Sequence, residues 1–199
     1  SFYTFQLIGY LFDRKPEPSS ITLKESILFT VFFPQLIAGP IERADELIRK
    51  LKASFDDFKF DRINVKHGFS LLSIGLFLKT FLSDVLIIFI GDSLYKTGFL
   101  GALTTIFCNG SVIYFDFLGY SLIALGIGLI FNVRLTLNFD RPYAALDFQE
   151  FWRRWHITLT RWFKDYVYKP IAARFNYSQF GVLISTIIVF SLTAKWHGF

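Results

Sequence analysis

The 199-residue chain has a single cysteine, Cys108, and no methionine. One cysteine excludes an internal disulfide bond and a cysteine-rich metal site within these residues. The chain begins at Ser1, without an initiator methionine, and it ends at Phe199, one residue after a Trp-His-Gly triplet. We therefore expect residues 1–199 to be one core unit of a longer protein, truncated at both ends.

Charged residues are also few, at 19% of the chain, whereas hydrophobic residues make up 53% and aromatic residues 20%. The mean hydropathy is +0.43. These values exceed what a soluble core of this length requires and favour an integral membrane protein. The net charge of +5 is modest. In a membrane protein it bears on orientation and not on nucleic-acid binding.

Five apolar stretches cover residues 1–12, 21–41, 68–90, 98–133 and 180–196. The last four approach or exceed the roughly 20 residues that a spanning helix needs. The stretch 98–133 fits one span with a re-entrant piece, or two short spans broken near Asn109 and Gly110. We predict an all-α, polytopic transmembrane bundle with interfacial and re-entrant helices, in which the number of crossings is open.

Two polar segments separate these stretches and are rich in lysine and arginine. Residues 42–67 contain seven such side chains and residues 134–175 contain eight. Because cytoplasmic loops carry an excess of lysine and arginine, both segments are predicted to face the cytoplasm.

A helix is predicted from Asp147 to Lys169, with Asp147 as N-cap, Glu150 completing a capping box and Pro170 ending the helix. At about 100° per residue its aromatic side chains share one face, and basic side chains lie opposite. The aromatic face comprises Phe148, Phe151, Trp152, Trp155, Leu159, Trp162, Phe163 and Tyr166. This pattern is typical of a helix lying in the membrane interface.

Asp116 lies in an otherwise apolar run. It either pairs with a lysine or arginine to hold helices together or lines a substrate path, and an intramembrane carboxylate favours the second role. Lys79, Asp84 and Lys195 are also candidates, although the long side chains of Lys79 and Lys195 can instead reach an interface. His67, beside Lys66, is predicted to be a solvated loop residue.

Two further histidines follow tryptophans: His156 borders the two faces of the predicted helix, and His197 lies near the end of the last apolar stretch. Imidazole suits proton transfer near neutral pH. Each could instead be a packed or interfacial histidine. Neither has cysteine or carboxylate neighbours at metal-ligand spacing, which argues against a zinc site.

Taken together and in order, six motifs resemble the membrane-bound O-acyltransferase family, most closely its bacterial branch around alginate O-acetyltransferase. The resemblance covers essentially the whole chain, and the Phe-Trp-Arg-Arg-Trp-His block is its most specific part. The motifs are Ser1-Phe-Tyr-Thr-Phe-Gln6, Phe32-Phe-Pro-Gln-Leu-Ile-Ala-Gly-Pro-Ile-Glu-Arg43, Asp116-Phe-Leu-Gly-Tyr-Ser121, Asn138-Phe-Asp-Arg-Pro-Tyr143, Phe151-Trp-Arg-Arg-Trp-His156 with its continuation to Tyr166, and Trp196-His-Gly198.

The resemblance implies an enzyme that moves an acyl group, here acetyl, from a cytoplasmic thioester donor to a hydroxyl of an exported polysaccharide. It implies that His197 is the catalytic base and that His156 positions or polarises the donor. We expect a polar cavity to join the two imidazoles. The residues expected to bind substrate are Asp116, Asn138, Trp152, Trp155 and Trp196.

By the same resemblance we expect no bound cofactor, acetyl-CoA as the donor substrate, periplasmic acetylation partner proteins and a multi-pass location in a bacterial inner membrane. One alternative is D-alanyl transfer from a carrier protein in teichoic acid modification, although the Pro-Gln-Leu-Ile-Ala-Gly-Pro stretch favours the alginate type. The alternative of another class is a transporter or channel in which Asp116, Lys79 and the histidines form an ion relay.

Overall fold

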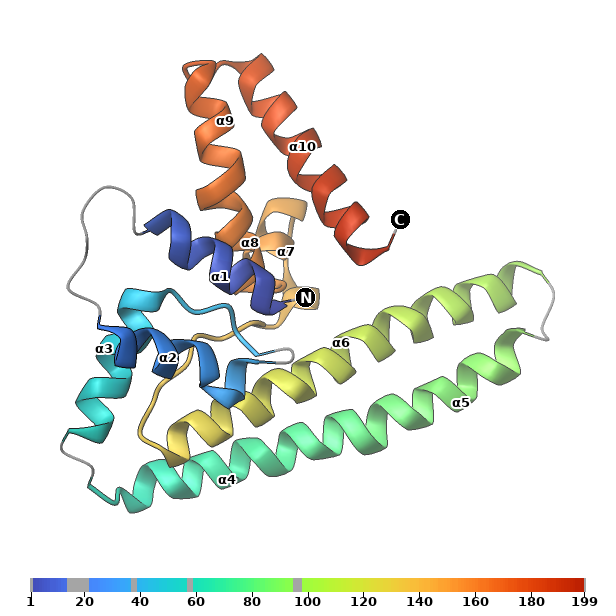
Figure 1. Cartoon of the computed structure of the whole chain (residues 1–199). Coiled ribbons are helices and arrows are strands. Elements are labelled where there is room, and N and C mark those ends of the chain that lie inside the picture. Colours follow the sequence, from blue (N-terminus) through green and yellow to red (C-terminus); the bar gives the residue numbers. More distant parts are fainter. Residues whose placement is uncertain (1, 14–21, 37–38, 57–58, 95–97, 199) are drawn as a thin grey trace.

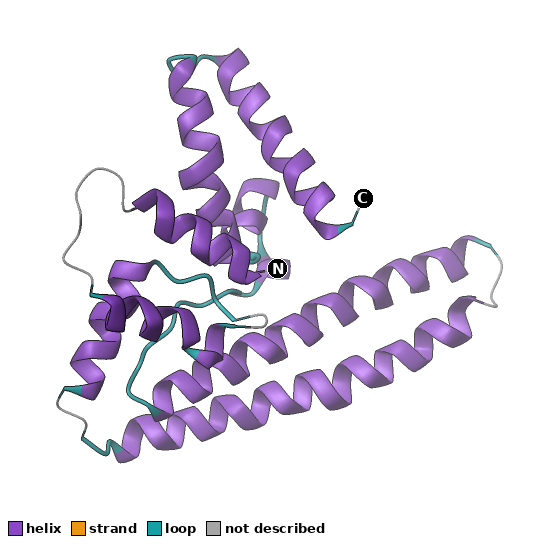
Figure 2. Cartoon of the chain, in the orientation of Figure 1, coloured by secondary structure: helices purple, strands orange, loops and turns teal. Residues whose placement is uncertain are grey.

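The computed structural model describes residues 2–13, 22–36, 39–56, 59–94 and 98–198, and these contain helices and loops but no strand (Figures 1 and 2). The predicted all-α fold is confirmed. The helices in chain order are α1 (Phe2–Asp13), α2 (Leu23–Val31), η1 (Phe33–Gln35), α3 (Ala44–Phe55), α4 (Arg62–Leu76), η2 (Phe77–Leu82), α5 (Ser83–Leu94), α6 (Phe99–Ile130), η3 (Pro142–Ala144), α7 (Phe148–Arg154), α8 (Ile157–Phe163), η4 (Lys164–Tyr168), α9 (Lys169–Arg174) and α10 (Gln179–His197).

Two helical hairpins dominate the molecule (Figure 1). In the first, α4, η2 and α5 run as one long rod antiparallel to α6. In the second, α9 and α10 are antiparallel, and the end of α10 points back toward the start of α1. The smaller helices α1, α2 and α3 gather beside the open end of the first hairpin, where α4 begins and α6 ends (Figure 1).

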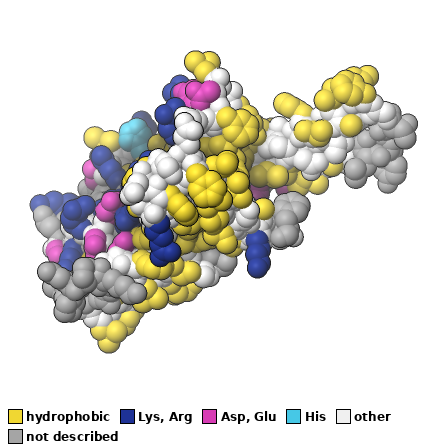
Figure 3. Space-filling view, turned by 90° about the horizontal axis from the view of Figure 1, so that it is seen from above, with side chains coloured by type: hydrophobic (Ala, Val, Ile, Leu, Met, Phe, Trp, Pro, Cys, Tyr) yellow, Lys and Arg dark blue, Asp and Glu magenta, His cyan; other side chains and the backbone are white. Residues whose placement is uncertain are grey.

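Three described helices are long and apolar enough to cross a membrane, namely Arg62–Ile88, Phe99–Ile130 and Gln179–His197. Most of their residues are not buried inside the protein, which leaves apolar side chains available to face lipid. Figure 3 shows hydrophobic side chains over the projecting end of the first hairpin, whereas charged side chains concentrate toward the opposite end of the molecule. The predicted membrane character of the chain is confirmed by these helices.

Two expected features of the spans are wrong. The stretch 21–41 is no span, because α2 has only nine residues and is followed, after Phe32, by the 3₁₀ turn Phe33–Gln35, which contains Pro34. The stretch 98–133 is neither broken nor re-entrant but one 32-residue helix. Asn109 does not interrupt it because its side-chain amide donates to the carbonyl of Thr105, one turn back, at 2.9 Å.

Four glycines bring the backbones of α4 and α6 into contact. A Cβ added at Gly75 would lie 2.6 Å from the carbonyl oxygen of Gly119, and one added at Gly68 would lie 2.7 Å from that of Gly126. The two contacts are seven residues apart on both helices. Because lipid offers helices little hydrophobic incentive to associate, such close backbone packing is a main source of their affinity.

A buried apolar cluster joins α2 and α3 to the end of α6 and the segment that follows it. Its members are Phe29, Phe32, Ala44, Leu47, Ile48, Leu51, Leu125, Val133 and Leu135. Four of them come from residues 44–51, which were predicted to lie in a polar loop. That segment is instead the amphipathic helix α3, which buries Leu47 and Leu51 completely. His67 likewise lies in α4 and not in a loop, although it is exposed as expected.

An extended segment leads from α6 toward the predicted site. Asn132 adopts a left-handed conformation (φ 57°), and its side chain accepts from Asn64 and donates to the Lys59 carbonyl, at 3.0 and 2.8 Å. Farther along, the backbone N–H of Thr136 donates to the buried carboxylate of Glu42 at 2.5 Å. These bonds fix the path of residues 132–136 and therefore the position of Asn138.

We predict that Gly75→Ala destabilises the first hairpin by about 1–3 kcal/mol, because the added methyl group would meet backbone atoms that cannot rotate away. Gly91→Ala is the matched control, since its Cβ would have no atom within 4 Å and alanine is the better helix former. Thermal unfolding in detergent should show a lower midpoint for the first variant only. Equal midpoints would contradict the role of this contact.

Single cysteines can test the predicted orientation in a Cys108→Ala background. Arg153→Cys and Arg161→Cys replace exposed residues of the segment that we place on the cytoplasmic side. An impermeant thiol reagent should label both only from the cytoplasmic face of sealed vesicles. Labelling from the outer face would invert the orientation.

Candidate active site

The helix expected from Asp147 to Lys169 is not continuous. It breaks at His156, and this break creates the candidate site. Helix α7 ends at Arg154 and α8 begins at Ile157. Between them His156 adopts left-handed angles, φ 40° and ψ 55°. A right-handed helix cannot accommodate a residue in this conformation, so the chain turns there and the single aromatic face is divided.

The ends of the predicted helix also differ in detail. Asp147 is the N-cap, as predicted, and accepts from the backbone N–H of Glu150 at 2.7 Å. The Glu150 carboxylate accepts from Leu146 at 2.7 Å, one residue before the position a capping box requires. Pro170 does not end the helix, because the π-helix η4 leads into α9 and the proline occupies the first turn of α9, where a missing N–H is tolerated.

Backbone hydrogen bonds hold the turn at His156 from both sides. The N–H of Ile157 donates to the carbonyl of Asn138 at 2.8 Å, and the N–H of Asp140 donates to the carbonyl of Arg154 at 3.0 Å. Residues 138–140 therefore run alongside the break in the helix. The bonds satisfy polar groups that the interrupted helix would otherwise leave without partners.

The side chain of Asn138 extends this support into the spanning helix α6. Its amide donates to the hydroxyl of Ser121 at 3.0 Å, and its carbonyl accepts from the hydroxyl of Thr158 at 2.6 Å. Thr158 in turn accepts from the backbone N–H of Ile41 at 3.0 Å. Asn138 is 1% exposed. The structure thus places this predicted substrate-binding residue within the scaffold that positions His156.

Aromatic rings enclose the imidazole of His156, which is 4% exposed. The ring of Phe2 stacks on it at 5.5 Å between centroids, Phe117 lies at 4.6 Å and Phe139 meets it edge-on at 6.4 Å. Neither ring nitrogen has a hydrogen-bond partner among the described residues. Unpaired buried nitrogens are costly and rare, and they indicate a site that something else completes.

The pKa of His156 is lowered to about 3, mainly because the imidazole is buried and secondly because His197 lies nearby. The charged imidazolium is disfavoured because aromatic rings replace its hydration shell. At physiological pH the residue is therefore neutral. A neutral imidazole offers one N–H donor and one nitrogen acceptor to a bound molecule.

His197 lies in the last turn of α10 and is exposed, and Gly198 ends the helix in a left-handed conformation, φ 105°. The adjacent Trp196 meets the ring of Phe2 at 5.1 Å. Phe2 thus contacts both the His156 ring and the tryptophan beside His197. The expected polar cavity joining the two imidazoles stays a prediction.

Asp116 forms an ion pair with Lys79 at 2.5 Å, and its carboxylate side chain is 49% exposed. The pair joins α6 to the π-helix η2, which corresponds to the first of the two roles considered for Asp116. The next residue, Phe117, contacts His156. Asp116 therefore lies beside the site in sequence, but its carboxylate is directed to the facing helix.

Two of the predicted tryptophans have different surroundings. Trp155 packs against Phe139 at 5.1 Å and stacks on Phe151 at 5.5 Å, so it supports the aromatic wall around His156. Trp152 packs edge-on against Phe190 of α10 at 5.4 Å. Its indole N–H is buried and has no partner among the described residues. Trp152, which belongs to α7, thus contributes an unpaired hydrogen-bond donor where α7 packs against α10.

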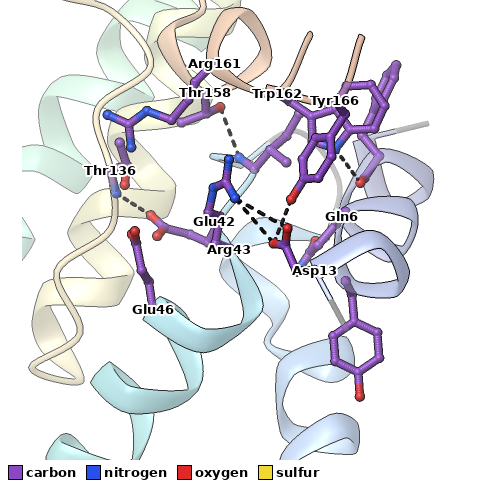
Figure 4. Close-up of a pocket in the computed structure, with 14 residues that line it drawn as sticks. Gln6, Asp13, Glu42, Arg43, Glu46, Thr136, Thr158, Arg161, Trp162 and Tyr166 are labelled. Atoms are coloured by element: carbon purple, nitrogen blue, oxygen red, sulfur yellow. Dashed lines mark hydrogen bonds and ion pairs between the residues drawn. The ribbon is translucent and has the colours of Figure 1, made fainter. Parts of the chain in front are cut away.

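A small, open hollow lies between α1, α8 and the residues before α3 (Figure 4). On its rim Arg43 pairs with Asp13 at 3.4 Å and with Asp165, and Tyr166 donates to Asp13 at 2.6 Å. Neither histidine lines it. The sequence did not predict this hollow, because its walls come from four separated segments, although Gln6 and Arg43 lie in two of the family motifs.

The pKa of His156 predicts how stability depends on pH. Above pH 6.5 the imidazole is neutral in both the folded and the unfolded chain. Below pH 6.5 only the unfolded chain takes up a proton, so the free energy of unfolding should fall by about 1.4 kcal/mol per pH unit until pH approaches 3.

His156→Asn removes this proton uptake, and asparagine tolerates the left-handed backbone. Urea unfolding in detergent at pH 7, 6 and 5 should show a shallower loss of stability in the variant than in the wild type. Parallel pH profiles would contradict a neutral, buried His156.

Comparison with known proteins agrees with the motifs. Residues 2–199 match the profile of the membrane-bound O-acyltransferase family. The chain is 36% identical to the peptidoglycan O-acetyltransferase of Helicobacter pylori and 34% identical to the probable alginate O-acetylase AlgI of Pseudomonas aeruginosa. Both alignments cover the whole chain. The teichoic acid D-alanyltransferase of Streptococcus thermophilus is 30% identical over 84% of the chain.

The chain spans about two fifths of the length of these relatives, with coverage of 43%, 38% and 42%, respectively. The match extends over the turn at His156, the apolar helix that ends at His197 and the hairpin that supports them. The chain therefore belongs to the membrane-bound O-acyltransferase family.

Proposed function

We propose that this protein transfers an acetyl group from a cytoplasmic thioester donor to a hydroxyl of an exported polysaccharide. The observation that carries the proposal is the state of His156, a neutral imidazole enclosed by aromatic rings, whose two nitrogens have no partner among the described residues. It lies close enough to His197 for the charge of one to affect the other. An exposed and a buried imidazole suit the two roles that acyl transfer requires, namely removal of the hydroxyl proton and stabilisation of the developing negative charge.

The proposed chemistry follows from the weak nucleophilicity of a hydroxyl. His197 takes the hydroxyl proton as the oxygen attacks the thioester carbonyl carbon. The N–H of neutral His156 stabilises the negative charge that develops on the carbonyl oxygen. The carbon–sulfur bond then breaks, and the departing thiolate recovers the proton from His197. Because His156 is neutral, it does not repel the cation that forms on His197 during the reaction.

The names of the relatives support the acetyl group and the polysaccharide acceptor, since two of them are called O-acetyltransferase or O-acetylase. The basic segments around α3 and α7–α9 support a donor that arrives from the cytoplasm, and acetyl-CoA is the donor we propose. We further propose a bacterial inner-membrane location and periplasmic partner proteins that complete polysaccharide acetylation.

Two alternatives have weaker support. D-alanyl transfer is favoured by the relatives called teichoic acid D-alanyltransferases, but these have lower identity, 30% and 24%. An ion relay through Asp116 would need a carboxylate free to exchange protons or ions, whereas Asp116 is paired with Lys79. Acetylation of a polysaccharide acceptor by the purified protein would separate acetyl transfer from both alternatives.

We predict that His197→Ala in the full-length protein lowers turnover of acetyl transfer by roughly 10² to 10⁴ while the protein stays folded in the membrane, because it removes a general base. His67→Ala is the matched control, since His67 is exposed on α4. Release of free thiol from acetyl-CoA, measured with an acceptor oligosaccharide, should separate the two variants. Wild-type turnover in His197→Ala would refute the assignment of the base.

A further inference from the structure

The ring of Phe2 contacts both halves of the candidate site. It stacks on the imidazole of His156, with centroids 5.5 Å apart, and meets the ring of Trp196 edge-on at 5.1 Å. Trp196 in turn packs against the imidazole of His197 at 4.5 Å. Phe2 therefore links His156 to the tryptophan that adjoins His197. The chemistry proposed above requires both imidazoles to act on one thioester, so the reacting group has to come close to this ring.

The imidazole of His156 cannot be reached while the rings around it stay in place. It is 4% exposed, and neither of its nitrogens has a hydrogen-bond partner among the described residues. Acyl transfer requires one of these nitrogens to come within hydrogen-bond distance of the substrate. At least one of the enclosing rings, which belong to Phe2, Phe117 and Phe139, must therefore move when a substrate binds.

Phe117 and Phe139 are held in place by their surroundings. Phe117 belongs to the 32-residue helix α6, which glycine contacts hold against α4. Phe139 is 6% exposed. Its ring packs at 5.1 to 5.6 Å against three others, those of Tyr114, Phe117 and Trp155. Moving either ring would disrupt the wall that supports the turn at His156.

Phe2 differs from these two because its side chain is only partly buried and its helix is anchored elsewhere. The indole N–H of Trp162 donates to the carbonyl of Phe5 at 2.8 Å, and Asp13 at the far end of α1 accepts from Tyr166 at 2.6 Å. These bonds hold the backbone of α1. A change of rotamer at Phe2 breaks neither of them, so this ring can turn while the helix stays in position.

We propose that the ring of Phe2 is a movable barrier that controls access to His156 and turns aside when the acyl end of the donor enters. The identity of the entering group rests on the proposed function. While the ring is in place, it keeps water away from the imidazole, and the acyl group fills the vacated space when the ring has turned. The barrier thereby limits hydrolysis of the thioester, a side reaction in which water replaces the acceptor hydroxyl.

Diethyl pyrocarbonate modifies the neutral imidazole of an accessible histidine, and it therefore measures access to His156 without any transfer chemistry. In the full-length protein at neutral pH, peptide mapping by mass spectrometry should show slow modification of His156. In Phe2→Ala the rate should rise roughly tenfold to a hundredfold, because the ring contacts that close the site are lost. His67, which is exposed on α4, is the internal reference in every sample.

Phe5→Ala is the matched control, because Phe5 lies one turn farther along α1. Its ring packs against three others, those of Trp162, Phe163 and Trp196, at 4.6, 5.4 and 5.2 Å. If loss of any ring from α1 loosened the helix enough to expose His156, both alanine variants would be modified alike. We expect the rate at His156 in Phe5→Ala to equal that of the wild type.

Phe2→Leu and Phe5→Leu form a milder pair, which keeps the test decisive if alanine prevents folding. The rate of His156 modification should rise from phenylalanine to leucine to alanine at position 2, as the side chain becomes smaller, and stay constant at position 5. The same trend at both positions, or rapid modification of His156 in the wild type, would overturn the barrier.

A second measurement tests what the barrier does for the reaction. Release of free thiol from acetyl-CoA is compared with and without an acceptor oligosaccharide. Hydrolysis relative to transfer should rise several-fold in the Phe2 variants and not in the Phe5 variants, since water then reaches the thioester. An unchanged ratio would refute protection of the thioester. If the wild type transferred no acetyl group, the proposed function would fail, whereas the modification of His156 would still decide whether Phe2 is the barrier.

Discussion

The close contact between α4 and α6 is the constraint on which the rest of the structure depends. Glycines at two positions on each helix let the backbones touch, and this fixes the rotation of α6 about its own axis. With that rotation set, Ser121 meets Asn138 and Phe117 meets His156. The hairpin thus serves as the wall on which the candidate site is built, although the residues of the site come from later segments of the chain.

The turn at His156 combines two unfavourable features, a left-handed backbone and a buried imidazole without partners among the described residues. Each costs stability, and such costs persist where the surrounding structure imposes them and function uses them. Here the surroundings are the bonds from residues 138–140 and the rings of Phe2, Phe117 and Phe139. The same burial that destabilises the turn keeps the imidazole neutral, the form that can both donate and accept a proton.

Sequence reasoning predicted the features that local composition controls. The apolar stretches 68–90, 98–133 and 180–196 correspond to the three candidate spans, because length and hydropathy suffice to identify them. The Asp147 cap was predicted correctly because it depends on a residue three positions away. The break at His156 was missed because the helical spacing of aromatic residues continues across it. The span predicted at 21–41 failed because hydropathy does not register the prolines that divide it.

By itself, the sequence determined a membrane-embedded, all-α chain of a recognisable acyltransferase family, since hydropathy, helix signals and short motifs are local properties. Only the tertiary structure decided which side chains surround His156, since Phe2, Phe117 and Phe139 come from three separated segments. It also decided that Asn138 supports the turn and that Gln6 and Arg161 share a hollow. The burial of a side chain and its hydrogen-bond partners depend on contacts between distant segments. The periodic pattern of one segment contains no information about those contacts.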